Sequence, residues 1–285
     1  MRVFAVEGNR QRLDGGAMFG NAPRPLWSRW CPPDALNRID LAARSLLVVE
    51  PAGRRILFEA GIGAFLAPEL AERYGVYEPS HRLLESLEAL GVAPEDIDVI
   101  VLSHLHFDHA GGLLAAWQAN RAPALCFPRA RYVTGVRALE RAAAPHPRDR
   151  ASFIAELPAL LRGTGRLELV EGGASDTLGP SYRHFTSEGH TPGLLLTRIQ
   201  GATDSLLVVG DLAPGIPWLH LPITMGYDRY PERLVDEKRE RFEQALGDRS
   251  WVFFTHDPQQ AFCRLGRDER GRFHAVDARV EPFEL

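Results

Sequence analysis

Short apolar runs alternate with amphipathic stretches along the whole chain, and this alternation predicts an α/β fold. The apolar run Val99–Leu102 is the clearest example and fits a buried strand. The runs expected to form strands are Arg2–Val6, Ser45–Glu50, Ile56–Phe58, Val99–Leu102, Arg131–Val133, Leu167–Val170, Tyr182–Phe185, Leu194–Ile199, Ser205–Val209 and Trp251–Phe254.

The stretches between these runs carry the helical pattern. The clearest predicted helix begins after Ser80, which can cap it, and ends at Gly91. Its apolar face is formed by Leu83, Leu84, Leu87 and Leu90. Three further helices are expected at Val136–Ala144, at Arg150–Arg162 and from about Pro231 to Leu246.

The chain contains no internal repeat and no low-complexity linker, so residues 1–285 are expected to form a single domain. Two segments extend this domain. The N-terminal loop (about residues 14–34) is rich in Pro and Gly but too apolar to stay in water, which predicts that it packs on the body. Residues of about 135–165 are rich in Ala, Arg and Pro and are expected to form a helical insertion.

Composition and charge exclude several classes of protein. Hydrophobic residues make up 45% and charged residues 25%, as in an ordinary globular protein. The 33 basic and 37 acidic residues are well mixed, so no basic face for nucleic acid is expected. The N-terminus lacks the apolar run of a signal peptide, and no segment is long and apolar enough to cross a bilayer. These features predict a cytoplasmic protein in which Cys31, Cys126 and Cys263 are reduced.

A dense cluster of metal-binding residue types follows the predicted strand Val99–Leu102. The sequence SHLHFDHAGG places His104, His106, Asp108 and His109 where that strand should end, and ligands in α/β folds gather beyond the carboxyl ends of strands. Four donors within six residues crowd a single ion. We therefore expect His104 and His106 to face one metal ion and Asp108 and His109 to face a second.

Three further donors each stand at the end of a predicted strand. His190 follows the strand that ends near Phe185, Asp211 ends the run SLLVVGD, and His256 ends WVFFTH. A single His or Asp in such a place usually has a structural role. The recurrence at three strand ends, together with the cluster at 104–109, indicates a metal site. The histidines outside this pattern are expected to be structural or exposed: His81, His146, His184 and His274.

The motif SHLHFDHAGG, followed by His190, Asp211 and His256, resembles the metallo-β-lactamase superfamily over nearly the whole chain. This resemblance implies an α/β fold built as a four-layer αβ/βα sandwich, with the site at one edge between two sheets. It also implies two divalent metal ions, with zinc first and iron or manganese as alternatives. By the same analogy, His104, His106 and His190 hold the first ion, Asp211 bridges both, and the second is held by Asp108, His109 and His256.

Two metal ions in such a site would generate a metal-bridging hydroxide from water and polarise the oxygen under attack. This chemistry predicts hydrolysis of an ester, lactone, thioester or phosphoester. Asp108 and Asp211 are the candidates to carry a proton to the leaving group. No nucleophile-elbow motif is present, and none is required, because water supplies the nucleophile.

Two stretches resemble the quorum-quenching lactonase-like branch of this superfamily: LDGGAMFGNAPRPLW near the N-terminus and GDLAPGIPWLHLPITMGYD around and after Asp211. Methyl parathion hydrolase shares the general plan of that branch. In such enzymes an apolar N-terminal loop lies over the metals and receives an acyl or aromatic group. The candidates for that surface are Met18, Phe19, Trp27 and Trp30, and the alternative is that they only pack the loop onto the sheets.

The chain departs from the best-known lactonases of this branch at one position. They carry a Tyr three residues after the bridging Asp, and this chain has Pro214 there. Tyr227 in the following loop is the candidate to supply the missing hydroxyl, and His220 is a candidate to approach the substrate pocket.

The sequence therefore predicts a dinuclear-metal hydrolase that opens lactones of the acyl-homoserine lactone type. The first alternative is a phosphotriester or aryl-ester hydrolase of the methyl parathion hydrolase type. Two others are a non-catalytic metal-binding protein and oxidative chemistry with iron. The expected partner is a small lactone or ester rather than nucleic acid or membrane, and analogy with relatives suggests a homodimer.

Overall fold

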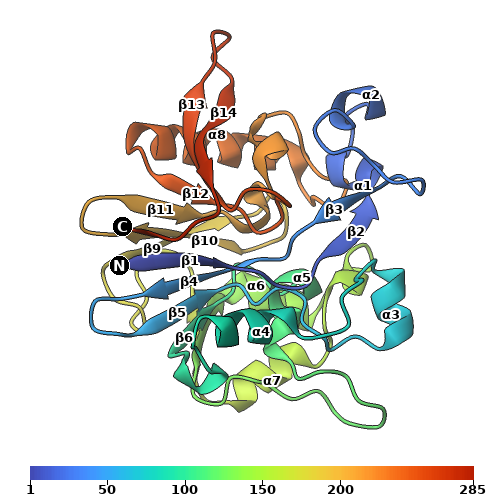
Figure 1. Ribbon diagram of the computed structural model, residues 1–285, viewed down its shortest axis with the longest axis vertical. Coiled ribbons are helices and arrows are strands. Elements are labelled where there is room, and N and C mark those ends of the chain that lie inside the picture. Colours follow the sequence, from blue (N-terminus) through green and yellow to red (C-terminus); the bar gives the residue numbers. More distant parts are fainter.

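The computed structural model describes residues 1–285 as two sheets packed face to face, with helices on both outer faces (Figure 1). The larger sheet has seven strands in the order β15-β1-β4-β5-β6-β7-β8. Their bounds are β1 (Arg2–Val6), β4 (Ser45–Val49), β5 (Arg55–Phe58), β6 (Val99–Val101), β7 (Arg131–Gly135), β8 (Leu167–Val170) and β15 (Phe283–Glu284).

The smaller sheet has six strands in the order β14-β13-β12-β11-β10-β9. They are β9 (Tyr182–Ser187), β10 (Leu194–Gln200), β11 (Ser205–Val208), β12 (Trp251–Phe253), β13 (Phe262–Arg267) and β14 (Phe273–Arg279). A separate two-stranded ribbon consists of β2 (Gln11–Asp14) and β3 (Arg38–Leu41). Strands β5 to β8 pair in parallel, as do β11 and β12, so their carboxyl ends meet at common edges.

Helices cover the sheets on their outer sides and complete a four-layer arrangement (Figure 1). The larger sheet is covered by α4 (Arg82–Ala89), α6 (Val136–Ala143) and α7 (Leu157–Gly163), and the smaller sheet by α8 (Pro231–Gly247). The remaining helices are short: α1 (Gly15–Phe19), α2 (Arg24–Trp27), α3 (Pro68–Arg73) and α5 (Phe107–Ala110). The predicted α/β sandwich is confirmed. None of the helices has both the length and the apolar character needed to span a membrane.

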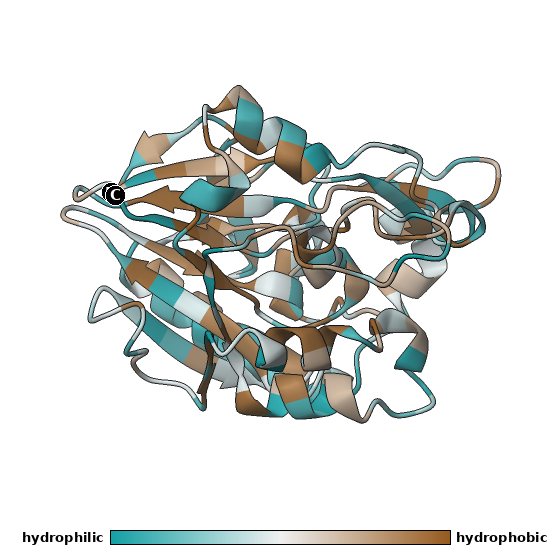
Figure 2. Ribbon diagram, turned by 90° about the horizontal axis from the view of Figure 1, so that it is seen from below, coloured by the Kyte–Doolittle hydropathy of each residue, from teal (hydrophilic) through white to brown (hydrophobic).

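Alternation along the strands explains these layers. In β5, Ile56 and Phe58 point into the core between the two sheets, whereas Leu57 points toward the helices. In β11, Leu206 and Val208 likewise face the core between the sheets. These central strands are thus apolar at all positions after the first, because both of their faces are covered. Figure 2 shows this pattern as apolar residues along the central strands and mixed residues on the helices.

All ten predicted strands are present, with ends within two residues of the expected positions. The strands β2, β3, β13, β14 and β15 were not predicted. Each is short or carries several charged residues, as in the sequence QRLD of β2 and FHAVDAR of β14, so an apolar pattern does not identify it. Such strands lie at or near sheet edges, where one face or one side meets water.

Two details of the predicted helices were wrong. The clearest helix begins at Arg82 rather than after a Ser80 cap, and the side chain of Asn9 accepts the hydrogen bond of the Arg82 N–H (3.3 Å). Its predicted end at Gly91 is confirmed by a positive φ of 71° there. The helix expected from Arg150 is instead one short 3₁₀ turn, and α7 begins only at Leu157.

Candidate metal centre

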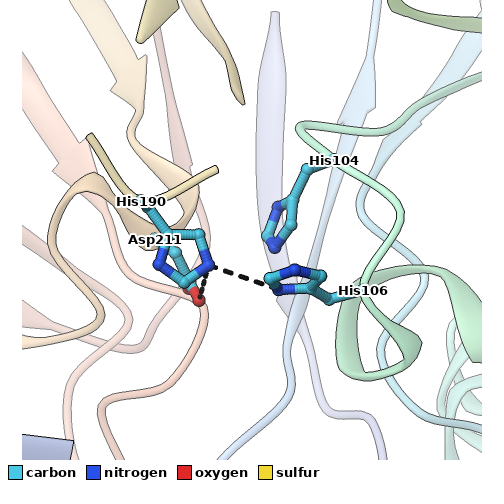
Figure 3. Close-up of side chains that lie close together, drawn as sticks. All are labelled: His104, His106, His190 and Asp211. Atoms are coloured by element: carbon cyan, nitrogen blue, oxygen red, sulfur yellow. Dashed lines mark hydrogen bonds and ion pairs between the residues drawn. The ribbon is translucent and has the colours of Figure 1, made fainter. Parts of the chain in front are cut away.

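The seven predicted metal-binding side chains converge at one edge of the sandwich. His104 and His106 follow β6, and the short helix α5 carries Asp108 and His109. The other three follow strands of the smaller sheet: His190, Asp211 and His256. Figure 3 shows His104 and His106 on one side of the gap between the sheets and His190 and Asp211 on the other. Residues far apart in the sequence thus meet because each stands just beyond the end of a strand.

The ligand atoms form two groups, in each of which they lie within 4.8 Å of one another. The first group is His104, His106, His190 and Asp211, and the second is Asp108, His109 and His256. Asp211 faces both groups. Its Oδ2 lies 3.2 Å from Nε2 of His190, and its Oδ1 lies 3.2 Å from Nε2 of His109 and of His256.

Outer hydrogen bonds orient two of the imidazoles toward the centre. Nδ1 of His190 donates to Oδ1 of Asp228 (2.8 Å), and Nδ1 of His256 donates to the carbonyl oxygen of Ala42 (2.7 Å). In a neutral ring the other nitrogen then carries a lone pair. Both Nε2 atoms therefore present lone pairs to the interior of the centre.

These lone pairs face further imidazole nitrogens of the two ligand groups. Nε2 of His190 lies 3.3 Å from Nδ1 of His106, and Nε2 of His256 lies 3.0 Å from Nε2 of His109. Nε2 of His104 and Nε2 of His106 are buried without a hydrogen-bond partner. Buried polar atoms normally have partners. A cation at each group would provide them, so the donor set fits metal ions.

The electrostatics differ among the ligands. Burial would lower the pKa of His109, His190 and His256, but the charge of Asp211 outweighs it and raises the pKa of all three, so metal binding there displaces protons. Burial and the neighbouring imidazoles lower the pKa of His104 and of His106, so both rings stay neutral. Burial alone would raise the pKa of Asp211, but the surrounding imidazoles hold it well below its usual value. Neutral imidazole and ionised carboxylate are the ligand forms of these side chains.

Four residues that the sequence did not identify support the ligands. Asp228 holds His190, and Oε2 of Glu59 lies 3.4 Å from Nδ1 of His109. The side chain of Gln11 donates to Oδ2 of Asp108 (3.1 Å). The fourth is Ser103, whose hydroxyl lies 2.9 Å from Nδ1 of His104. Glu59 stands directly after β5, so the strand-end placement that identified Asp211 would have found it as well.

The segment of residues 144–155, here called the covering segment, links α6 to the start of α7 and lies against the centre. Its Phe153 packs edge-on against His106, with ring centroids 4.7 Å apart. Its Arg148 donates from Nη2 to the carbonyl oxygen of Gly226 (2.9 Å), and the N–H of Gly226 donates to the carbonyl oxygen of Ala17 (2.8 Å). The covering segment, α1 and the loop before α8 therefore meet at Gly226.

The structure places the predicted substrate residues in different surroundings. Met18, Phe19 and Trp27 are buried in the core beside the smaller sheet, where the Phe19 ring stacks on Trp27 and on Trp218 at centroid distances of 5.5 and 4.5 Å. Packing of the N-terminal loop onto the body is therefore confirmed as their structural role. Contact with a substrate stays a prediction for these residues.

Trp30 and His220 line a pocket of about 720 Å³ that contains none of the seven candidate ligands. Tyr227 lies in the loop before α8 and is 41% exposed. Burial raises the pKa of Tyr227, and the charges of Asp108 and Asp14 raise it further, so its hydroxyl stays protonated. Contact of these three side chains with a substrate also stays a prediction.

Comparison with known proteins identifies the family. Residues 40–256 match the family model described as "Metallo-beta-lactamase superfamily". A probable metal-dependent hydrolase from Staphylococcus aureus has a similar structure, with 26% identity, a TM-score of 0.85 and 96% of each chain covered.

Two lactonases share the fold at lower identity. AidC, a dizinc quorum-quenching lactonase solved with the product N-hexanoyl-L-homoserine, has 22% identity and a TM-score of 0.75, with 96% of this chain and 93% of AidC covered. An N-acyl homoserine lactone hydrolase with the same product bound at its catalytic metal centre has 18% identity and a TM-score of 0.66, covering 90% of this chain and 93% of that one.

Proposed function

The chain belongs to the metallo-beta-lactamase superfamily and is a metal-dependent hydrolase, and we propose that it opens lactones of the acyl-homoserine lactone type with a dinuclear metal centre. One observation carries the proposal: the two oxygens of Asp211 face two separate groups of imidazoles. A structural zinc site closes around one ion and needs no such bridging carboxylate.

In this proposal His104, His106 and His190 hold one ion, Asp108, His109 and His256 hold the second, and Asp211 holds both. Two divalent cations there would supply the Lewis acidity that ionises water near neutral pH and polarises the carbonyl under attack. Zinc suits the imidazole and carboxylate donors best, with iron or manganese as alternatives.

The side chains around the centre have separate tasks. Asp108 is the more accessible carboxylate, with 16% of its side chain exposed against 7% for Asp211. We therefore assign to Asp108 the transfer of a proton to the leaving oxygen. The protonated hydroxyl of Tyr227 donates a hydrogen bond to the substrate carbonyl. Pro214 cannot do so, because its side chain has no hydrogen-bond donor.

The choice of lactones among esters is supported by the two lactonase structures, which match this chain over at least 90% of its length. In both, an acyl-homoserine product is bound, and in one it lies at the catalytic metal centre. A zinc centre, a homodimer and a cytoplasmic location belong to the same proposal.

A substrate panel tests the proposal. The protein is stripped with a chelator, reloaded with Zn²⁺ and assayed against hexanoyl- and decanoyl-homoserine lactone, simple γ-lactones, paraoxon and aryl esters. We expect the highest kcat/KM for the acyl lactones, loss of turnover in the stripped protein and recovery on reloading. Turnover of paraoxon or aryl esters alone would establish the alternative substrate class, and two bound ions without any turnover would indicate a non-catalytic metal-binding protein.

A further inference from the structure

Helix α8 lies on the outer face of the smaller sheet and supplies none of the candidate ligands, yet two of its adjacent residues bind the loops around His190. Glu237 is 17% exposed and pairs with Arg233 of its own helix, whereas Lys238 is fully buried and burial lowers its pKa to about 7. A buried charge is costly unless it is paired or hydrogen-bonded, so the partners of both side chains indicate what they stabilise.

The carboxylate of Glu237 binds the loop that leads into His190. Its Oε2 accepts hydrogen bonds from Ser187 Oγ (2.6 Å) and from the N–H of Gly189 (3.1 Å), and its Oε1 accepts from the N–H of Glu188 (2.9 Å). This loop lies directly on the helix, since a Cβ at Gly189 would be 2.5 Å from the Cα of Leu234.

The side-chain amino group of Lys238 binds the segment on the other side of His190. Lys238 is fully buried, and its Nζ donates to the carbonyl oxygens of His220 (3.2 Å), Leu221 (3.2 Å) and Ile223 (2.8 Å). The three N–H groups of Lys238 thus match three carbonyl oxygens of the residues that follow the 3₁₀ turn Ile216–Leu219.

The segment whose carbonyl groups bind Lys238 continues to Asp228, the carboxylate that orients His190. The N–H of Met225 donates to Oδ2 of Asp228 (2.6 Å), and Oδ1 of Asp228 accepts from His190 (2.8 Å). A backbone hydrogen bond joins the same two regions, since the N–H of Arg229 donates to the carbonyl oxygen of His190 (3.1 Å). Two routes therefore run from α8 to one imidazole, one through residues 187–189 and one through residues 220–228.

We propose that Glu237 and Lys238 are positioning residues that fix His190 and thereby set the affinity of the centre for the ion that His190 binds. The inference rests on the proposed dinuclear centre. The two residues are not interchangeable, since a carboxylate only accepts and an ammonium only donates, and the two loops offer N–H groups and carbonyl groups respectively. The histidines of the loop 104–109 receive no contact from this pair.

Stepwise metal affinity tests the inference without any substrate. Stripped protein is titrated with Zn²⁺ against a chromophoric chelator, which resolves the two binding steps, and His190→Ala identifies the step that depends on His190. In Glu237→Gln we expect that step alone to weaken by about tenfold, the low end of the effect of outer partners of metal ligands, with the other step unchanged. The matched control is Glu240→Gln on the same helix, where Glu240 is 68% exposed and pairs only with Arg241.

Lys238→Met is the more severe variant because it leaves the carbonyl groups of Leu221 and Ile223 without a donor, whereas that of His220 still accepts from the N–H of Ile223. We expect it to weaken the same step by at least as much, and Glu237→Gln keeps the test valid if Lys238→Met does not fold. If Glu237→Gln lowers the melting temperature but both affinities stay within twofold of the original, or both fall together, the inference is wrong. A chain that binds no second ion even before mutation would overturn the dinuclear proposal instead.

Discussion

The two sides of the metal centre are built in different ways. One side is the ligand loop, residues 104–109, in which four candidate ligands follow β6 within six residues. The other side consists of the strand-end ligands His190, Asp211 and His256, which come from three separate strands of the smaller sheet. In the ligand loop the chain itself keeps the donors together. The strand-end ligands depend on partners elsewhere, such as Asp228 and the helix α8 for His190.

The largest effect is expected where the two sides meet. Asp211→Asn removes the only carboxylate that faces both groups of ligands, and the amide nitrogen would place a donor against imidazole nitrogens. We expect both metal-binding steps to weaken and kcat/KM to fall by roughly 10³-fold, beyond the loss of about 10–100-fold typical of an outer partner. Metal titration and lactone turnover measure the two effects.

The control for this variant is Asp236→Asn, because Asp236 is exposed on α8 and pairs only with Arg239 at the surface. If Asp211→Asn weakened a single step, the two sides of the centre would be independent, and the bridging role of Asp211 would be wrong.

This difference also explains how much of the site the sequence reveals. The ligand loop is visible as a motif because its spacing is local, and the strand-end ligands are visible because each ends an apolar run. Asp228 and Glu237 carry no such signal, since the first lies in an irregular loop and the second on a polar helix. Their roles depend on which loops pack together, which is a property of the tertiary fold.

The fold shows the same limit. Strands buried on both faces, such as β5 and β11, are apolar after their first residue and were predicted within one residue. The hairpin of β13 and β14 was missed because charged residues interrupt its pattern, as in FCRLGR. Likewise the aromatic residues of the N-terminal loop suggested a surface for substrate, but Phe19 and Trp27 pack in the core, and composition alone cannot distinguish the two roles.

We expect acid to lower the free energy of unfolding on the side of the strand-end ligands, because His184 becomes protonated. This side chain is buried on β9, the strand that leads toward His190, and its Nδ1 lies 3.0 Å from Thr197 Oγ1. Burial lowers the pKa of His184 to about 4. The folded protein therefore keeps the ring neutral, and the stability this provides is complete above about pH 6.5 and is lost as pH falls toward 4. The loss amounts to about 3 kcal/mol.

Urea unfolding of metal-free protein at pH 7, 5.5 and 4 measures this loss, with His184→Asn as the variant. The difference in unfolding free energy between the two proteins should shrink as pH falls, because the variant has no ring to protonate. No strand of the larger sheet contains a histidine, but burial also lowers the pKa of His104 and of His106 in the ligand loop, so only the difference between the two proteins reports on His184. An equal pH dependence in both proteins would assign acid sensitivity to other groups.

A matched pair of substitutions compares the outer partners of the two sides. Asp228→Asn weakens the hold on His190, whose Nδ1 lies 2.8 Å from the carboxylate, and Glu59→Gln weakens the hold on His109 at 3.4 Å. Loss of an outer partner costs about 10–100-fold in metal affinity, and the shorter contact places Asp228→Asn nearer the upper end. Stepwise Zn²⁺ titration should show each variant weakening a different step. If both variants weakened the same step, the division of ligands between the two ions would be wrong.

The smallest effect is expected from Tyr227→Phe, which removes one hydroxyl from a side chain that binds no metal. Loss of a single hydrogen bond to the substrate carbonyl should lower kcat/KM for acyl lactones by up to about tenfold and leave both metal affinities unchanged. Tyr230→Phe, which changes a neighbouring exposed tyrosine, is the control. Because burial and Asp108 raise the pKa of Tyr227, its contribution should persist through neutral and mildly alkaline pH. If Tyr227→Phe retained full kcat/KM, Tyr227 would have no part in polarising the substrate carbonyl, and the metal ions held by the two sides of the centre would do so alone.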